Sequence, residues 1–492
     1  MPTDKKRPRG AAAASGAALT LGAALAAGQP AQAATFTVTN LDDDGPGSLR
    51  QAVNDANAAA GADVIDFQPG LTGAIVLSTG QLAVNDSVEI QGPGATDLAV
   101  FGNYNRVFYL YNPAALLDVT ISGLTIGGGE ATDGGGIADI GENLVLDGVT
   151  LTGNHAINEG GGLFVLSGGK GDSATITIRQ STISGNSADV NGGGIKVRGA
   201  YLPAVLIEDS VIAGNFSGQD GAGIHLPQLQ GSFTLQSSTV SGNIAGDAGG
   251  GIYLYNLYGG SLTARNSTIA ANSAGGAGGG LFVQSGGASI EDSIVGDNTA
   301  GADNDLATGA EASVDLRYTL VESPGAANIN DNGGNIFNQD PQLGPLGNNG
   351  GPTQTQVPAG TSPAIDAGDP AFVPPPSTDQ RGFQRVRNGR LDMGAVEINP
   401  GQIQLSASAA SAGENAGTVT ITVTRTGGTD GDVSVSFATS DGTAVAPADY
   451  LAALGVLNWA SGDGAPKTFQ VTIVNDASDE PDETFNVTLS NP

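Results

Sequence analysis

The stretch Gly192-Gly193-Gly194-Ile195-Lys196-Val197-Arg198 is one copy of a motif in which a cluster of glycines precedes a short alternating strand. Five related copies begin at Gly134, Gly160, Gly221, Gly249 and Gly278, so that successive copies start 26, 32, 29, 28 and 29 residues apart. A second motif keeps the same period and ends at Asn154, Asn186, Asn215, Asn243 and Asn272. A regular period of this length, filled by short β-branched strands, predicts a solenoid of stacked parallel strands and disfavours helical repeats.

The alternation within each copy assigns the two faces of its strand. In the copy quoted above, Ile195 and Val197 are expected to point into the solenoid, whereas Lys196 and Arg198 are expected to point outward. Similar short aliphatic runs lie upstream of the regular repeats. The sequence therefore predicts an all-β fold, a parallel β-helix of nine or ten coils over residues 62–321.

The end strands of a β-helix have to be covered, because an unpaired strand edge invites association. A short amphipathic helix is predicted over residues 47–60, with Ser48 as its N-cap. Its apolar face consists of Leu49, Ala52, Val53 and Ala56. We expect residues 34–61 to form an N-terminal cap around this helix.

Two kinds of polar residue recur once per coil. The asparagines of the second motif are expected to stack, so that their amides hydrogen-bond from coil to coil as a ladder. Acids recur just before the Ser or Thr that opens the next strand, at Asp147, Glu208, Asp209, Glu291 and Asp292. We interpret this recurrence as a requirement of a turn rather than as a catalytic acid pair.

The composition is acidic and free of cysteine. The chain carries 49 Asp and Glu against 18 Lys and Arg, which gives a net charge of −31. Such a charge repels nucleic acids and anionic membrane surfaces and makes cations the natural partners. Without cysteine, a disulfide framework, a zinc–thiolate site and a thiol nucleophile are all excluded.

The N-terminus has the pattern of an export signal. Basic residues at positions 5–9 precede an alanine-rich apolar stretch at 11–27, and Ala31-Gln32-Ala33 fits a cleavage site. We predict a signal peptide over residues 1–33, an extracellular or cell-surface location, and no membrane span in the mature chain. The alternative is that this stretch is a short membrane anchor.

The N-terminal segment and the segment that follows the repeats resemble known families. Gly47-Ser48-Leu49-Arg50-Gln51-Ala52-Val53 resembles the start of secreted bacterial β-helix proteins, and the repeats resemble polymorphic outer-membrane-protein β-helices. Within residues 322–398, Ser362-Pro363-Ala364-Ile365-Asp366, Asp379-Gln380-Arg381-Gly382 and Asp392-Met393-Gly394 resemble a choice-of-anchor Q domain. The resemblance implies a right-handed β-helix in a secreted or surface protein that is part of a larger or anchored assembly.

The sequence pattern changes after Pro400-Gly401. Alternating runs at 419–423 and 433–437, separated by glycine turns, predict a small β-sandwich over residues 399–492. From residue 401 onward, 11 acids face two bases, which gives a net charge of −9. Acids on loops at one end of a sandwich suit Ca²⁺, which takes six to eight oxygen ligands in flexible geometry.

This C-terminal segment resembles the Calx-beta domain, an immunoglobulin-like fold. The motifs are Glu414-Asn415-Ala416-Gly417, Asp441-Gly442-Thr443, Ala448-Asp449-Tyr450 and Asp482-Glu483-Thr484-Phe485. The resemblance implies calcium ligands at Glu414, Asp441, Asp449, Asp476, Glu480 and Glu483, and a last strand that is absent from this chain. The alternative is that these acids only form turns.

The sequence favours a non-enzymatic role. Parallel β-helices include polysaccharide lyases and glycoside hydrolases, so a carbohydrate-active enzyme is the alternative function. The two histidines, His155 and His225, lack a recurring Ser or Asp partner that would suggest a nucleophilic triad. We expect a surface adhesin or display protein, whose partner is a polysaccharide or a surface protein.

One outward-facing set of residues is a candidate ligand-binding face. It consists of Phe164, Lys196, Arg198, Tyr253, Tyr255 and Phe282, with His225 in the same column. Aromatic rings can stack on sugar faces, and the two cations can meet an anionic saccharide. The alternatives are stacking that only stabilises the sheet, which would make the β-helix a passive spacer, or coverage by the loops that carry Tyr201 and Tyr258.

Overall fold

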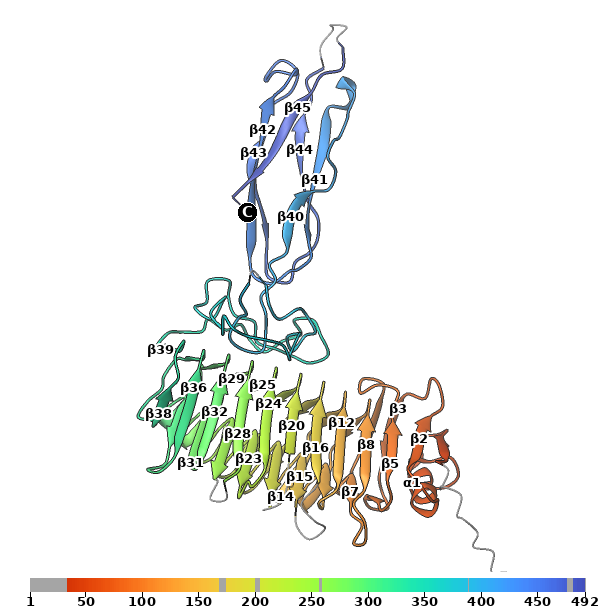
Figure 1. Ribbon diagram of the computed structural model, residues 1–492. Coiled ribbons are helices and arrows are strands. Elements are labelled where there is room, and N and C mark those ends of the chain that lie inside the picture. Colours follow the sequence, from red (N-terminus) through yellow and green to blue (C-terminus); the bar gives the residue numbers. More distant parts are fainter. Residues whose placement is uncertain are drawn as a thin grey trace, which may run out of the picture.

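The computed structural model describes residues 33–167, 174–199, 204–255, 259–387, 389–475 and 481–491. It has an elongated solenoid of parallel strands, a loop-rich segment along one side of the solenoid, and an upright β-sandwich beyond that segment (Figure 1). The predicted signal peptide lies outside the described residues, apart from Ala33. Within the described part of the chain, no helix is long and apolar enough to cross a membrane.

The coils of the solenoid contribute strands to four sheets, which we number in the order in which a complete coil, such as that from β12 (Asn143–Asp147) to β15 (Leu163–Leu166), visits them. Within the described ranges, the coils before β10 (Glu130–Asp133) and after β35 (Leu306–Thr308) have no strand in sheet 3. Sheet 1 contains β1 (Thr35–Val38), β2 (Asp63–Phe67), β5 (Val88–Gln91), β8 (Asp118–Ser122), β12 (Asn143–Asp147), β16 (Thr175–Arg179), β20 (Ala204–Glu208), β24 (Ser232–Gln236), β28 (Ser261–Arg265), β32 (Gly287–Glu291), β36 (Ser313–Arg317) and β38 (Ile329–Asp331). Sheet 2 contains β3 (Gly73–Val76), β6 (Leu98–Phe101), β9 (Thr125–Gly127), β13 (Thr150–Thr152), β17 (Thr182–Ser184), β21 (Val211–Ala213), β25 (Thr239–Ser241), β29 (Thr268–Ala270), β33 (Ile294–Gly296), β37 (Leu320–Val321) and β39 (Ile336–Phe337).

The other two sheets follow in the same coils. Sheet 3 contains β10 (Glu130–Asp133), β14 (His155–Glu159), β18 (Ser187–Ala188), β22 (Phe216–Ser217), β26 (Ile244–Ala245), β30 (Ser273–Ala277) and β34 (Thr299–Ala302). Sheet 4 contains β4 (Leu82–Val84), β7 (Phe108–Leu110), β11 (Ile137–Asp139), β15 (Leu163–Leu166), β19 (Ile195–Arg198), β23 (Ile224–Pro227), β27 (Ile252–Tyr255), β31 (Leu281–Ser285) and β35 (Leu306–Thr308). The predicted parallel β-helix is thus confirmed.

The ends of the solenoid differ from the predicted boundaries. Strand β1 pairs with β2 in sheet 1, so part of the predicted cap is already a coil. At the other end, β38 and β39 extend the sheets beyond residue 321 to Phe337. The cap helix α1 (Leu49–Ala58) begins as expected, because the Oγ atom of Ser48 accepts a hydrogen bond from the backbone N–H of Gln51 at 3.1 Å.

The interior follows the predicted alternation. Leu163, Ile195, Ile224, Ile252 and Leu281 stand in register in neighbouring strands of sheet 4, and all are at most 1 % exposed. A column of aliphatic side chains inside a solenoid removes apolar surface from water coil by coil, at about 25 cal/mol per Å². The core is therefore continuous along the axis.

The predicted asparagine ladder is present and buried. From Asn186 onward, the Oδ1 atom of each asparagine accepts two hydrogen bonds from the asparagine of the preceding coil, one from its backbone N–H and one from its Nδ2. The Oδ1 atom of Asn154, the first member, accepts from the backbone N–H of Gly129. The ladder runs through Asn154, Asn186, Asn215, Asn243, Asn272 and Asn298. It ends on Asp305, whose Oδ1 atom accepts from the Nδ2 of Asn298 at 2.9 Å.

Two of the recurring acids occupy turns as interpreted, whereas Asp147, Glu208 and Glu291 are the last residues of β12, β20 and β32. Asp209 and Asp292 have φ angles of 49° and 48°, in the left-handed region, and Gln180, Ser237 and Asn266 take the same conformation in other coils. The serine that follows forms a second ladder. The Oγ atom of Ser210, for example, accepts from the backbone N–H of Ser181 at 3.1 Å.

Residues 341–398, which we call the strap, run back along the outer face of sheet 2 (Figure 1). The Oγ1 of Thr353 donates to the carbonyl of Asp209, and the backbone N–H of Gly394 donates to the carbonyl of Asp292. Outward residues of sheet 2 are consequently buried, among them Thr239, Thr268 and Ile294. The strap has isolated β-bridges but no named strand or helix in its described part.

The strap contains a buried group of charges. Arg381 donates to Asp379, and the charge of the same carboxylate also acts on the guanidinium group of Arg385. Asp392 and Glu397 are 2 % and 1 % exposed. Burial, followed by repulsion from Asp392, raises the pKa of Glu397 to about 8. Burial raises the pKa of Asp392 to about 6.

The C-terminal domain is an antiparallel β-sandwich. One sheet has the order β40 (Gln402–Leu405), β41 (Thr418–Thr426), β44 (Lys467–Thr472), and the other has the order β43 (Leu454–Trp459), β42 (Val433–Asp441), β45 (Phe485–Ser490).

A buried ion pair joins this domain to the strap. The Nη1 and Nη2 atoms of Arg381 donate to the two carboxylate oxygens of Asp430 at 2.8 and 3.0 Å. A bidentate pair of this kind fixes geometry as well as distance.

The ladder should be costly to interrupt. In an Asn215→Ala variant, the backbone N–H and the Nδ2 of Asn186 lose their buried acceptor. We expect the free energy of unfolding, measured by urea denaturation, to fall by about 2–4 kcal/mol, since each orphaned donor costs about 1–3 kcal/mol. Asn330→Ala is the matched control, because the side chain of Asn330 is exposed in the same solenoid, and it should change stability by less than about 0.5 kcal/mol. Equal losses in both variants would contradict a special role for the ladder.

The acids of the strap should make stability depend on pH. Because the pKa values of Asp392 and Glu397 are raised in the folded state, the folded protein binds more protons than the unfolded chain between about pH 4 and pH 8. Their contribution to the free energy of unfolding therefore falls as pH rises through this interval. We expect a lower thermal midpoint at pH 8.5 than at pH 5.5, and a smaller difference in Glu397→Gln. A wild-type midpoint that is higher at pH 8.5 would refute this assignment.

Candidate functional site

The predicted ligand-binding face is a real column, but most of it is not open to solvent. Phe164, Lys196, His225, Tyr253 and Phe282 stand in register across sheet 4. Phe164, Lys196 and His225 are 5 %, 1 % and 4 % exposed, so the expectation of an exposed face is wrong at these three positions. The loops that carry Tyr201 and Tyr258 lie outside the described residues.

Lys196 is held by its neighbours rather than presented to a ligand. Its Nζ atom lies 2.8 Å from the Oε1 of Glu159 and 2.6 Å from the Nδ1 of His225. Burial lowers the pKa of Lys196 to about 8, against the attraction of Glu159, which raises it. Burial also lowers the pKa of His225 well below 6.5, and the charge of Lys196 adds to this. The neutral imidazole can thus accept a hydrogen bond from the ammonium group of Lys196.

The remaining members of the column are more accessible. The ring of Tyr253 stacks on His225 at a centroid distance of 4.8 Å and meets Phe282 edge-on at 5.5 Å. Tyr253, Tyr255 and Phe282 are half-buried, and the side chain of Arg198 is 54 % exposed. Stacking between coils explains these contacts, which is the stabilising alternative given above.

His155 has partners that the sequence did not indicate. Its Nδ1 lies 2.9 Å from the Oγ of Ser187, and its Nε2 lies 3.8 Å from the carboxylate of Asp189. Both partners come from the next coil, 32 and 34 positions along the chain. The hydrogen bonds of a nucleophilic triad are typically about 2.6–3.2 Å and are often longer in structures without substrate. The distance to Asp189 exceeds the typical range.

The described calcium-ligand candidates gather at the end of the sandwich that is far from the β-helix (Figure 1). Asp441 ends β42, and its Oδ1 accepts from the hydroxyl of Tyr450 at 2.7 Å. Asp449 accepts from the backbone N–H of Val445 at 2.7 Å. Glu414 begins the 3-10 helix η1 (Glu414–Ala416) and is exposed.

The other candidates complete this end of the domain. Glu483 is exposed and precedes β45, whereas Asp476 and Glu480 lie outside the described residues. The backbone N–H of Val474 donates to the carbonyl of Asp449. Within the described part of the domain, no three acids bring their ligand atoms within 4.8 Å of one another.

One cluster of acidic residues was not predicted from the sequence. Asp297, Glu322 and Asp340 follow sheet 2 in three successive coils, and their carboxylate oxygens lie within 4.8 Å of one another. Burial raises the pKa of Asp297, and the charges of Glu322 and Asp340 add to the effect. The signal was present as acids near the ends of successive strands, but it falls where the repeat becomes irregular.

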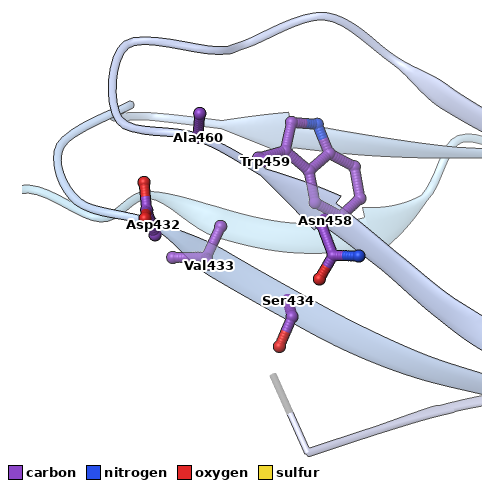
Figure 2. A pocket seen from close by; sticks show the side chains of 6 residues that line it. All are labelled: Asp432, Val433, Ser434, Asn458, Trp459 and Ala460. Atoms are coloured by element: carbon purple, nitrogen blue, oxygen red, sulfur yellow. The ribbon is translucent and has the colours of Figure 1, made fainter.

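Two open pockets are present in the described structure. The first has a volume of about 360 Å³ and lies at the base of the sandwich, between β42 and β43 (Figure 2). Ser434 and Asn458 point to one side of the paired strands, whereas Trp459 points into the core (Figure 2). The Nε1 of Trp459 already donates to the carbonyl of Ala465, and Asp432 accepts from Ser461. These groups serve the fold.

The second pocket is a groove of about 380 Å³ on the outside of the β-helix, where sheet 2 meets sheet 3. Its lining residues are Val76, Phe101, Asn103, Tyr104, Gly128, Gly129, Glu130, Gly153 and His155. Sequence reasoning did not find it, because its members come from coils that precede or only begin the regular repeat. The outward position of Phe101 was the available signal.

The comparisons with known proteins agree with this architecture. Residues 107–316 match the model of the right handed beta helix region, and residues 397–492 match the model of the Calx-beta domain. No curated protein matches the chain.

Solved structures similar to this chain include domains of Calx proteins. The calcium binding domain CBD12 of CALX1.1 is 30 % identical, covers 18 % of this chain and 38 % of its own length, and has a TM-score of 0.18. The apo-form Calx CBD1 domain is 34 % identical, covers 16 % of this chain and 69 % of its own length, and has a TM-score of 0.16. CBD12 from CALX1.2 is 34 % identical, covers 16 % of this chain and 32 % of its own length, and has a TM-score of 0.16. The chain thus spans about two fifths of the first of these structures. It combines a right-handed parallel β-helix with a Calx-beta β-sandwich domain.

Proposed function

We propose that this protein is an exported adhesin or display protein at the cell surface or in the extracellular space. In this proposal the β-helix is a non-catalytic binding scaffold and the sandwich binds calcium. The observation that carries the proposal is the continuous chain of fixed contacts from the buried ladder through the strap to Asp430. A rigid rod that bears a module at a defined angle is suited to presenting a surface to a partner.

Export and anchoring belong to the same proposal. The signal-like segment 1–33 is the expected route of export, and the choice-of-anchor Q resemblance of residues 322–398 suggests attachment to the envelope or to a larger assembly. The absence of cysteine and the net charge of −31 are compatible with an extracellular setting.

Several observations support a non-catalytic β-helix over the alternative of a lyase or glycoside hydrolase. Asp209 and Asp292 occupy turns, and Lys196 is buried against Glu159. The contact of His155 with Asp189, at 3.8 Å, is longer than a hydrogen bond. A lyase base or a glycosidase acid pair has to reach the substrate. Asp209, Asp292 and Lys196 are instead engaged in the fold.

Binding without cleavage is the expected behaviour. A glycan-array screen of residues 34–492, in the presence of calcium and then of a chelator, should give hits that remain chemically intact. Product analysis of each hit checks this, since a lyase would leave unsaturated ends and a hydrolase new reducing ends. Either product would overturn the non-catalytic assignment, and failure to bind any glycan or any cell surface would overturn the adhesin.

Calcium binding is proposed at the distal loops of the sandwich. Support comes from the Calx-beta match and from the position of Glu414, Asp441, Asp449 and Glu483 at one end of the domain. Carboxylate and carbonyl oxygens are the ligands that Ca²⁺ prefers. An ion at this end would neutralise acids that otherwise repel one another.

An Asp449→Asn variant tests the calcium site. It keeps an oxygen that can accept from the backbone N–H of Val445 but removes one charge, so we expect at least a tenfold weaker calcium affinity by isothermal titration calorimetry. Calcium should also raise the thermal midpoint of the wild-type domain and raise that of the variant less. Asp463→Asn is the control, because Asp463 pairs with Lys467 at the opposite end of the sandwich. Absence of calcium heat in the wild type at millimolar ion would refute the site.

A further inference from the structure

The strap covers sheet 2 unevenly. Its hydrogen bonds and ion pairs with the solenoid begin at Asp209 and continue to Arg317, so they fall on the middle and later coils. Figure 1 shows the strap along the coils between β20 and β39 and away from the coils around β3 and β8. The outer face of sheet 2 is therefore open near β3 and β6, and the groove of about 380 Å³ lies there.

Two aromatic rings stand at this groove. Phe101 is 37 % exposed and Tyr104 is 83 % exposed. The ring of Phe101 lies against Gly127 and Gly128, where an added Cβ atom would come within 3.0 and 3.4 Å of ring carbons. These glycines let the ring lie close to the backbone with one side uncovered.

The loop that carries Tyr104 is held in an unusual conformation. Asn103 and Tyr104 both have positive φ angles, 46° and 67°. The loop is nevertheless fixed at both ends, because the N–H of Gly102 donates to the carbonyl of Gly127 and the N–H of Glu130 donates to the carbonyl of Asn105. Strained residues that the surroundings hold in place are typical of functional sites.

Hydrogen-bonding groups share the lining of the groove with the rings. They are His155, Glu130 and Asn103. The ring of His155 is oriented by its contact with Ser187 at 2.9 Å, and its side chain remains 35 % exposed. Three further lining residues, Gly128, Gly129 and Gly153, have no side chain, which leaves room for a ligand.

We propose that this groove binds a neutral saccharide, a hexose segment of an extracellular polysaccharide. The proposal rests on the adhesin function above and locates its ligand site. A pyranose with equatorial hydroxyls presents an apolar C–H face that stacks on aromatic rings and a rim of hydroxyls that bonds to His, Glu and Asn side chains. Glu130 and the net charge of −31 disfavour an anionic sugar. The volume is within the range of small-molecule sites, roughly 300–1,000 Å³.

The test is isothermal titration of the full chain with cellohexaose, a neutral probe with equatorial hydroxyls, and with polygalacturonate as an anionic comparison. We expect saturable binding of cellohexaose, at least tenfold weaker in Phe101→Ala/Tyr104→Ala, and weaker binding of polygalacturonate. Phe216→Ala is the matched control, because Phe216 is 47 % exposed on the same β-helix but does not line the groove. It should bind as the wild type does.

A second variant keeps both rings and instead places a side chain at one of the lining glycines. Gly153 has a φ of 63° and no atom within 4 Å of an added Cβ. The chain carries Ala271 and Asp297 at the equivalent turn, each with a φ of 58°, so a side chain is tolerated there. Gly153→Asn should fold normally by circular dichroism and lose at least tenfold in cellohexaose affinity.

The outcomes separate this site from the wider function. Full affinity in both groove variants, or an equal loss in Phe216→Ala, overturns the groove while leaving the adhesin intact if the protein still binds glycans or cells. Tighter binding of polygalacturonate than of cellohexaose overturns the neutral-saccharide assignment. Loss of glycan-array and cell binding in the unmodified protein overturns both proposals.

Discussion

Hydrogen bonding along the solenoid axis is the constraint on which the rest of the structure depends. A side-chain amide can accept on one side and donate on the other, so one asparagine per coil can repeat without leaving a buried polar group unpaired. The last position of the ladder needs a group that only accepts hydrogen bonds. The chain has a carboxylate there, that of Asp305, in place of another asparagine. Burial raises the pKa of Asp305 to about 6, although the bonds from Asn298 and Ser323 oppose this. The ladder also fixes the path of each coil, because the residue before each asparagine lies in the left-handed region, as at Gly214.

Periodicity made the solenoid predictable from sequence. The columns of Ile195 and its neighbours, the ladder and the left-handed turns all depend on spacing, which the sequence displays directly. Exposure was less predictable because it depends on partners from other coils. Lys196 occupies an outward position, yet it is buried against Glu159, which lies 37 positions earlier and carries no signal of that contact. The groove and the Asp297 group were missed for a related reason, since they form where the repeat is irregular.

The strap could not be derived from pattern, because it has almost no regular structure and its contacts are specific to single residues. Arg381 shows this most clearly. Its guanidinium group is fully buried between Asp379 of the strap and Asp430 of the sandwich, so one side chain sets the relation between two parts of the molecule. The cost of burying these charges is large, and breaking one partner leaves the other uncompensated. The contact therefore favours a single arrangement of the two domains more than it adds stability.

The outer surface keeps the acidic character of the composition. Arg381, Arg385 and Lys196 are among the few bases of the chain, and all three are withdrawn from solvent. Acids such as Asp392 and Glu397 are withdrawn as well, so the exposed charged groups remain predominantly acidic. Long-range attraction to an anionic partner is then unfavourable, so recognition has to come from short-range contacts such as ring stacking and directed hydrogen bonds. The open part of sheet 2 provides such contacts, whereas the strap removes the same face from solvent in the later coils. Calcium bound at the distal loops would make that end of the molecule less negative. It would leave the charge of the β-helix unchanged.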